Sequence, residues 1–233
     1  MAAAPITTTL NPTNEGYILG PSELTFAAAR NAATGAGAYN FTTSTPYLYA
    51  VYVRWYSQKG TNYWAITRTH FRFDTSSING TVSSATLKVA GYSLALADII
   101  VTKSTAFNGV GNTLVTSDFG NVDYTRLYSS EVPTWNLNSY NNIALNADAK
   151  TDIENENVFR VGLVEHDFDY LNVSTTGNPR SGIWFADGTY PVELSVTYTP
   201  SASVNFSING ISALNIGSIN GVDAASIAGG NGL

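Results

Sequence analysis

The chain has 233 residues and a formal net charge of −6, with only 12% charged residues and no cysteine. The lack of cysteine excludes disulfides, thiolate nucleophiles and cysteine metal sites. No run of lysine or arginine could follow a phosphate backbone, so we expect no nucleic-acid partner. No apolar run approaches the roughly 18 residues of a membrane-spanning helix, so we expect no membrane insertion. A surface so poor in charge is typical of a protein that packs against neighbours.

The first 20 residues are polar and rich in turn-forming residues, and we expect them to form an N-terminal arm. Residues 1–6 have neither a basic n-region nor a long apolar h-region, so they do not resemble a signal peptide. Residues 22–33 fit either a short helix capped by Ser22 or a first strand. We expect the strand, because Asn31 and a pair of glycines follow at once.

A strong β pattern begins at Pro46. Residues 47–56 are dense in aromatic and β-branched side chains, and residues 63–73 alternate in character. The alternation predicts one face with Ala65, Thr67, Thr69, Phe71 and Phe73, and another with Trp64, Ile66, Arg68, His70 and Arg72. On this pattern His70 points outward, as a surface or interface residue.

The remaining pattern is that of short strands separated by turn signals, with a helix at residues 146–153. The expected strands are residues 84–92, 98–104, 158–165, 182–186 and 192–199. This predicts an all-β, antiparallel jelly roll or β-sandwich over residues 21–200, with one short helix.

Residues 201–233 form a tail of a different kind, with an internal repeat. Residues 207–217 align with residues 218–228 at an offset of 11 positions. Aliphatic residues separated by Asn-Gly in so short a segment cannot build a core of their own. We therefore expect the tail to dock on its own domain, on a partner or on copies of itself. The residues expected to do so are Ile208, Ile211, Leu214, Ile216, Ile219, Val222 and Ile227.

Residues 69–89 (THFRFDTSSINGTVSSATLKV) resemble the F-x-F-D-[TL]-S-x-[IL] … A-x-L stretch of the DNRLRE-type jelly-roll domain of bacterial surface proteins and phage structural proteins. Further segments resemble that domain in the expected order, so the resemblance covers roughly residues 16–200. The tail repeats resemble C-terminal segments of phage tail and head proteins. The resemblance is specific for the fold and unspecific for the function.

The resemblance implies a non-enzymatic virion structural protein on the surface of a bacteriophage, made in the host cytoplasm. We expect a capsid decoration protein or head fibre first and a tail fibre component next. Its partners would be other virion proteins, of the capsid or tail, and copies of itself as an oligomer, bound through the terminal segments. The alternative is a carbohydrate-binding module or adhesin of a bacterial surface protein. That alternative places the protein outside the cell or at its surface, in contact with host-surface glycans.

Two sets of side chains are candidate sites. Glu165, Asp167 and Asp169 alternate, so on a strand they would share one face and offer oxygen ligands to Ca²⁺. A solvated edge is the interpretation we favour, because no Asp-x-Asp-x-Asp-Gly loop is present. No metal or other cofactor is therefore expected.

The second set is aromatic and lies within residues 47–64. These rings would either stack on sugars or fill the core and an interface, and we favour core and interface. The candidates for contact with a glycan or at an interface are Tyr52, Trp55, Tyr56 and Trp64. No nucleophile elbow and no HExxH pattern occurs in the chain, so we expect no enzyme.

Overall fold

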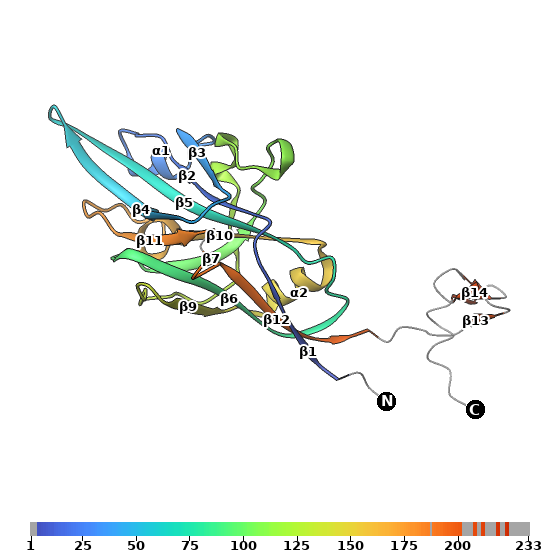
Figure 1. Cartoon of the computed structure of the whole chain (residues 1–233). Coiled ribbons are helices and arrows are strands. Elements are labelled where there is room, and N and C mark those ends of the chain that lie inside the picture. Colours follow the sequence, from blue (N-terminus) through green and yellow to red (C-terminus); the bar gives the residue numbers. More distant parts are fainter. Residues whose placement is uncertain are drawn as a thin grey trace.

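The computed structural model describes residues 4–186 and 188–201, together with the backbone of four two-residue strands between residues 207 and 223. The body is all-β and antiparallel, with few short helices, which confirms the predicted fold class (Figure 1). Its strands in chain order are β1 (Ile6–Leu10), β2 (Asn14–Leu19), β3 (Gly37–Phe41), β4 (Thr45–Gln58), β5 (Thr61–Asp74), β6 (Gly80–Ala95), β7 (Ile99–Ser104), β8 (Val122–Leu127), β9 (Tyr140–Ala144), β10 (Val158–Glu165), β11 (Arg180–Phe185) and β12 (Glu193–Pro200).

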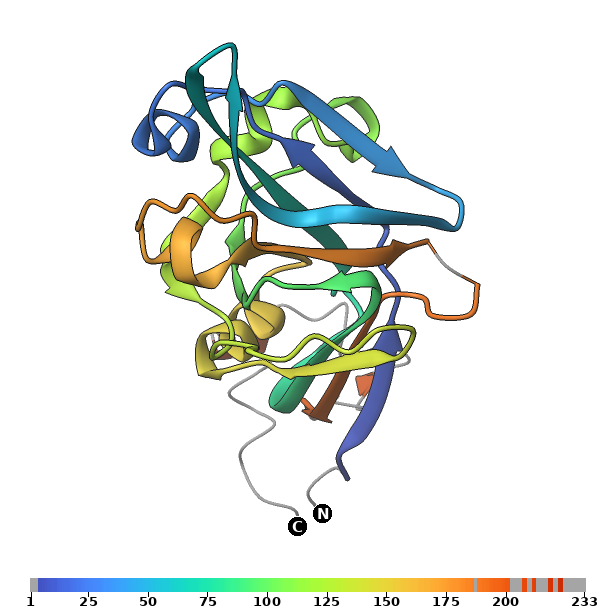
Figure 2. The same cartoon turned by 90° about the vertical axis from the view of Figure 1, so that its left-hand side faces the viewer.

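The strands form two layers that share the long strand β6. The first part of β6 pairs with β12 and β9, and β1 lies beyond β12. The last part of β6 pairs with β11, from which the larger layer continues through β4, β5, β10, β7 and β8. β4 and β10 pair with successive parts of one edge of β5, β2 pairs with its other edge, and β3 pairs with β2. Figure 2 shows the layers from the side.

The main core lies between the two layers. Alternate residues of each strand point inward, as the period of two requires. The smaller layer contributes Leu87 and Leu194, and the larger layer contributes Phe71, Phe73 and Phe159, all fully buried. The inward set predicted for residues 63–73 is confirmed at both phenylalanines.

A second cluster covers the other face of the larger layer. Ile18, Val53 and Ile66 pack there against helix α1 (Phe26–Arg30) and against Phe107 and Phe119, which lie in the segment after β7. The middle of the larger layer is thus buried on both sides. Among the described residues, no helix is long and apolar enough to cross a membrane.

Helix α1 replaces the strand expected at residues 22–33. The Thr25 hydroxyl accepts a hydrogen bond from the Ala28 N–H at 3.1 Å and so caps the helix. Three consecutive alanines favour a helix, and the capping residue is Thr25, not the Ser22 considered above. The helix predicted near residues 146–153 is confirmed as α2 (Ala147–Asn155), capped by Asn146.

The first 20 residues are not a free arm, contrary to the expectation. β1 pairs along its whole length with β12, and β2 lies between β3 and β5. Tyr17 and Ile18 are buried in the two apolar clusters. Threonine and asparagine suggested a loop, but threonine also favours strands, and pairing with distant segments decides between the two.

The chain enters and leaves the body at one end. Ile6 lies opposite Tyr198, so the start of β1 and the end of β12 are adjacent. The β4–β5 hairpin projects at the opposite end (Figure 1).

Both tail repeats contain the same local pairing. β13 (Ser207–Ile208) pairs with β14 (Ile211–Ser212), and β15 (Ser218–Ile219) pairs with β16 (Val222–Asp223), 11 positions later. The repeat found in the sequence is therefore also a repeat of backbone pairing. The side chains expected to mediate assembly lie outside the described residues: Ile208, Ile211, Leu214, Ile216, Ile219, Val222 and Ile227.

A buried ion pair joins β5 to the segments that cover it. The Arg68 guanidinium donates to both carboxylate oxygens of Asp169 at 2.8 Å. It also donates to the carbonyl oxygens of Phe119 at 2.9 Å and Arg30 at 2.8 Å. The Tyr124 hydroxyl donates to Asp169 at 2.7 Å. Neither charged side chain is exposed, so each depends on these partners for the hydrogen bonds that water would otherwise supply.

We predict that Asp169→Asn lowers the free energy of unfolding by about 3 kcal/mol or more, because it leaves the Arg68 charge buried and unpaired. Urea denaturation followed by tryptophan fluorescence measures the change. Asp167→Asn is the matched control, since the Asp167 side chain is about half exposed (47%), and it should change stability by less than about 0.5 kcal/mol. Equal effects of the two substitutions would contradict the assignment.

Candidate functional site

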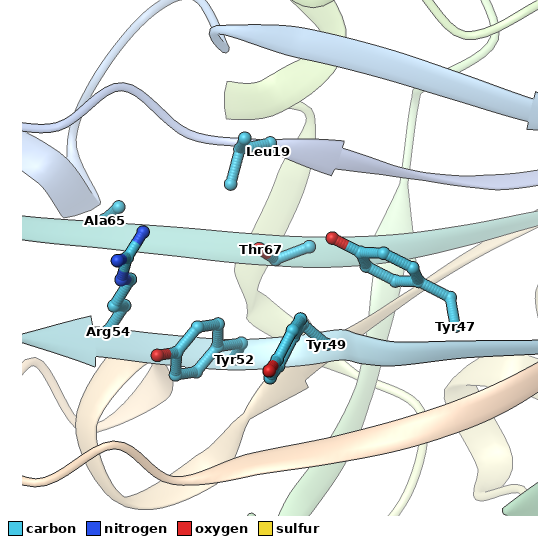
Figure 3. A pocket seen from close by; sticks show the side chains of 7 residues that line it. All are labelled: Leu19, Tyr47, Tyr49, Tyr52, Arg54, Ala65 and Thr67. Carbon is cyan, nitrogen blue, oxygen red and sulfur yellow. The ribbon is translucent and has the colours of Figure 1, made fainter. Parts of the chain in front are cut away.

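One face of β5 changes from core to open groove along the strand. Phe71 and Phe73 point into the core between the layers. Ala65 and Thr67, on the same face by the period of two, line a groove at the projecting hairpin (Figure 3). The groove is therefore the continuation of the core beyond the edge of the smaller layer.

An irregularity in β4 brings several tyrosines to this groove. Tyr47 and Val51, four positions apart, pair with Ile183 and Ser181, which are only two positions apart. Such a bulge changes which alternate residues share a face. Tyr49 and Tyr52, three positions apart, consequently both line the groove, as Figure 3 shows.

The groove has a volume of about 350 Å³ and is bounded by a row of rings. Tyr17 stacks on Tyr47 with centroids 4.0 Å apart, and Tyr49 stacks on Tyr52 at 5.2 Å. Tyr47 and Tyr49 meet edge to face at 6.0 Å, which joins the two pairs. The residues that line the groove are Leu19, Tyr47, Tyr49, Tyr52, Arg54, Ala65 and Thr67.

The row continues at both ends of the groove. Tyr39 of β3 stacks on Tyr17 at 4.6 Å. Near the hairpin tip, Tyr56 stacks on Tyr63 at 5.4 Å, and the Arg54 guanidinium lies 4.2 Å from the centre of the Tyr56 ring. We call the whole surface the tyrosine face; it comprises Tyr17, Tyr39, Tyr47, Tyr49, Tyr52, Tyr56 and Tyr63.

Among the described residues that line the groove, Arg54 carries the only charged side chain. Arg54 is exposed in the groove, and the Arg180 guanidinium lies 5.8 Å from the Tyr49 ring. Asn178 fixes the neighbouring strand, accepting hydrogen bonds from the Tyr52 hydroxyl at 3.1 Å and the Trp55 backbone N–H at 3.0 Å. Burial raises the pKa of the Tyr52 hydroxyl, so it stays neutral. No acidic side chain lies among the described residues that line the groove.

The four aromatic residues singled out from the sequence divide between two faces. Tyr52 and Tyr56 belong to the tyrosine face. Trp55 and Trp64 lie on the opposite face, directly across from each other, and Trp64 packs against the second cluster and donates to the Thr175 carbonyl at 2.9 Å. Alternation within the hairpin, over residues 52–58 and 61–67, was the signal that separates the two sets.

Two rings of the face were missed by sequence reasoning. Tyr17 and Tyr39 lie on β2 and β3, far from the hairpin in sequence. The interpretation of residues 1–20 as an arm hid Tyr17. No local signal predicts that β2 and β3 lie beside β5.

The three carboxylates considered as calcium ligands do not share a face. The segment His166–Tyr170 forms a single helical turn, not an extended strand. Glu165 accepts hydrogen bonds from the backbone N–H groups of Asp167, Phe168 and Asp169 at 2.7–3.3 Å. Asp169 is bound to Arg68, so only Asp167 is open to solvent.

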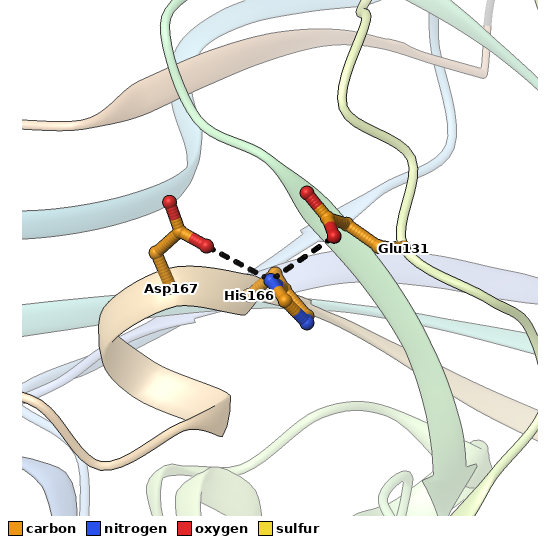
Figure 4. Close-up of side chains that lie close together, drawn as sticks. All are labelled: Glu131, His166 and Asp167. Carbon is orange, nitrogen blue, oxygen red and sulfur yellow. Dashed lines mark hydrogen bonds and ion pairs between the residues drawn. The ribbon is translucent and has the colours of Figure 1, made fainter.

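Another group of potential ligands surrounds His166 (Figure 4). Its Nδ1 lies 2.9 Å from Asp167 Oδ1 and 3.8 Å from Glu131 Oε2. Burial and the nearby negative charges of Asp167 and Glu131 raise the pKa of Asp98. Hydrogen bonding between neighbours explains this arrangement, and nothing else in the described part of the chain points to an ion there.

His70 is fully buried, which corrects the expectation of a surface residue. Its Nδ1 lies 3.0 Å from Ser104 Oγ. Burial lowers the His70 pKa to about 3, so the ring is neutral. The cause is tertiary: α1 and the segment after β7 cover the face of β5 that the pattern marks as outward.

No family model matches the chain, and no curated protein matches its sequence. The likeness to the DNRLRE-type domain therefore rests on the quoted residues alone.

Glu15, which precedes Tyr17 on the same face of β2, is a buried carboxyl group with incomplete hydrogen bonding. One oxygen accepts from the Ala186 N–H at 2.9 Å, and the other has no partner among the described residues. Burial raises the Glu15 pKa from 4.5 to about 7. The folded protein thus binds a proton more tightly than the unfolded chain between these two pH values.

We predict that stability falls as pH rises from about 4.5 to 7, since this group favours the folded state only while it is protonated. Glu15→Gln should match the natural chain at pH 5 and exceed its free energy of unfolding at pH 8 by up to about 3 kcal/mol. Denaturant titrations at both pH values measure the difference. Burial also raises the pKa of Glu165 to about 7. The variant should therefore retain part of the decrease in stability between these pH values. A pH dependence that Glu15→Gln leaves unchanged would contradict the prediction.

Proposed function

We propose that the protein is a non-enzymatic structural protein displayed on the surface of a phage particle. We favour a capsid decoration protein or head fibre over a tail fibre component. The observation that carries the proposal is that the two ends of the body differ. The chain enters and leaves at one end, and the β4–β5 hairpin, which carries much of the tyrosine face, projects at the other (Figure 1). A protein held by its terminal segments would present the tyrosine face outward.

Several features support attachment through the terminal end. The tail repeats one short hairpin pairing twice and leaves the body beside β1. The low content of charge suits association through backbone pairing and apolar contact. The resemblance to phage structural proteins points the same way.

Within the described part of the chain, nothing suggests catalysis. The Ser104–His70 contact is the nearest approach to a nucleophile with a base, and both residues are buried, so no substrate reaches it. His166 is flanked by carboxylates and not by a nucleophile. A binding or scaffolding role accounts better for the arrangement.

A second candidate is a carbohydrate-binding module or adhesin of a bacterial surface protein. The tyrosine face favours it, because exposed rings in a row are a common means of holding sugars. The two candidates differ in where the protein resides and not in what the groove contacts.

We predict that the chain is a component of purified particles and docks through its terminal end. The natural chain has no cysteine, so single cysteines can be labelled cleanly with a maleimide-polyethylene glycol of large mass. Particles that lack the protein should bind Gln58→Cys labelled at the hairpin tip. They should not bind Thr9→Cys labelled on β1, or a chain that ends at Pro200. Co-sedimentation measures binding, with both unlabelled variants as controls.

Particles that contain none of the protein by mass spectrometry would overturn the virion assignment, and recovery from the bacterial surface would support the second candidate. If the label at Gln58 prevents binding and the label at Thr9 does not, the protein attaches by the opposite end from the one proposed.

A further inference from the structure

We infer that the groove of the tyrosine face binds an acidic saccharide, held by stacking on Tyr49 and Tyr52 and by the guanidinium of Arg54. The inference deepens the proposed binding role and rests on the groove being presented away from the attachment end. It holds for either location, on a particle or on a bacterial surface.

The rings have the arrangement that a sugar requires. Tyr49 is exposed at 36% and Tyr52 is half-buried, and because the two rings stack on each other, each offers a ligand its outer face or its edge. Their faces suit the C–H groups of a pyranose, and a tyrosine also has a polar tip. A volume of about 350 Å³ lies near the lower limit for small-molecule sites, about 300 Å³, which fits a short saccharide.

The charges select an acidic sugar. The chain has only 11 lysine and arginine residues and a net charge of −6, yet Arg54 and Arg180 both lie at this face. No described residue lining the groove offsets them with negative charge. A planar guanidinium pairs with a carboxylate through two parallel hydrogen bonds, and nearby rings strengthen the pair by excluding water. A uronate or sialate carboxylate supplies that partner.

Other occupants fit less well. Single-stranded nucleic acid also stacks on rings, but it needs a row of cations that follows its backbone, and this face has two. For the chain's own tail, the point of departure is the end of β12, which lies beside the start of β1 and away from the β4–β5 hairpin (Figure 1). A stable protein interface covers roughly 800 Å² of each partner, far more surface than the groove exposes.

The test uses the full chain and isothermal titration with short oligomers of galacturonate, hyaluronate and sialic acid. The matched neutral probes are methyl-esterified oligogalacturonate and maltohexaose, with a thymidine oligonucleotide for nucleic acid. We expect binding of at least one acidic oligomer, weaker binding at high salt, and none of the neutral probes or the oligonucleotide. The chain that ends at Pro200 should bind equally well, which separates this result from failure of attachment.

Variants locate the site. Tyr49→Ala and Arg54→Gln should each weaken binding about tenfold, since each removes a main contact. Tyr49→Phe keeps the ring and should stay within about twofold of the natural chain. Arg160→Gln is the charge control, because Arg160 lies opposite Arg72 on the other face of the larger layer. No binding of any acidic oligomer, equal binding of neutral probes, preference for the oligonucleotide, or equal losses in Arg54→Gln and Arg160→Gln would each overturn the inference.

Discussion

The buried pair of Arg68 and Asp169 is the interaction on which the covered face of the larger layer depends. One guanidinium contacts the Asp169 carboxylate and the carbonyl oxygens of Phe119 and Arg30, and so ties the turn after β10, the segment after β7 and helix α1 to the middle of β5. Each of these segments is short. Their positions are coupled because removal of one partner leaves a buried charge that no water can reach.

The same constraint sets the geometry of the groove. Thr67 precedes Arg68 on β5 and points to the opposite face. The hydrogen bonds of Arg68 therefore fix the part of β5 that forms the floor of the groove. Asn178 holds the adjoining strand through the Tyr52 hydroxyl and the Trp55 backbone. The rings on this face are therefore ordered before any ligand arrives, and less conformational entropy is lost on binding.

The sequence predicted most strands because their patterns are local: β10 has the limits expected for it, and the two faces of β5 divide as alternation requires. The sequence did not predict the features that depend on contacts between segments far apart in the chain. β1 and β2 became strands by pairing with β12 and β5, and His70 was buried by α1 and the segment after β7. The bulge that places Tyr49 beside Tyr52 depends on the register with β11, which no local pattern encodes.

Tyr17 links the core to the groove, because its ring contacts both. The ring is 4% exposed, lies 6.3 Å from Phe185 in the core, and stacks on Tyr47 at the groove. Packing that stabilises the fold therefore also positions Tyr47, which lines the groove. An open aromatic surface invites aggregation in a chain so poor in charge, and Arg54 at the hairpin counters that tendency. An aromatic face that is costly to expose, yet ordered and far from the proposed attachment end, supports the proposal that it contacts a ligand.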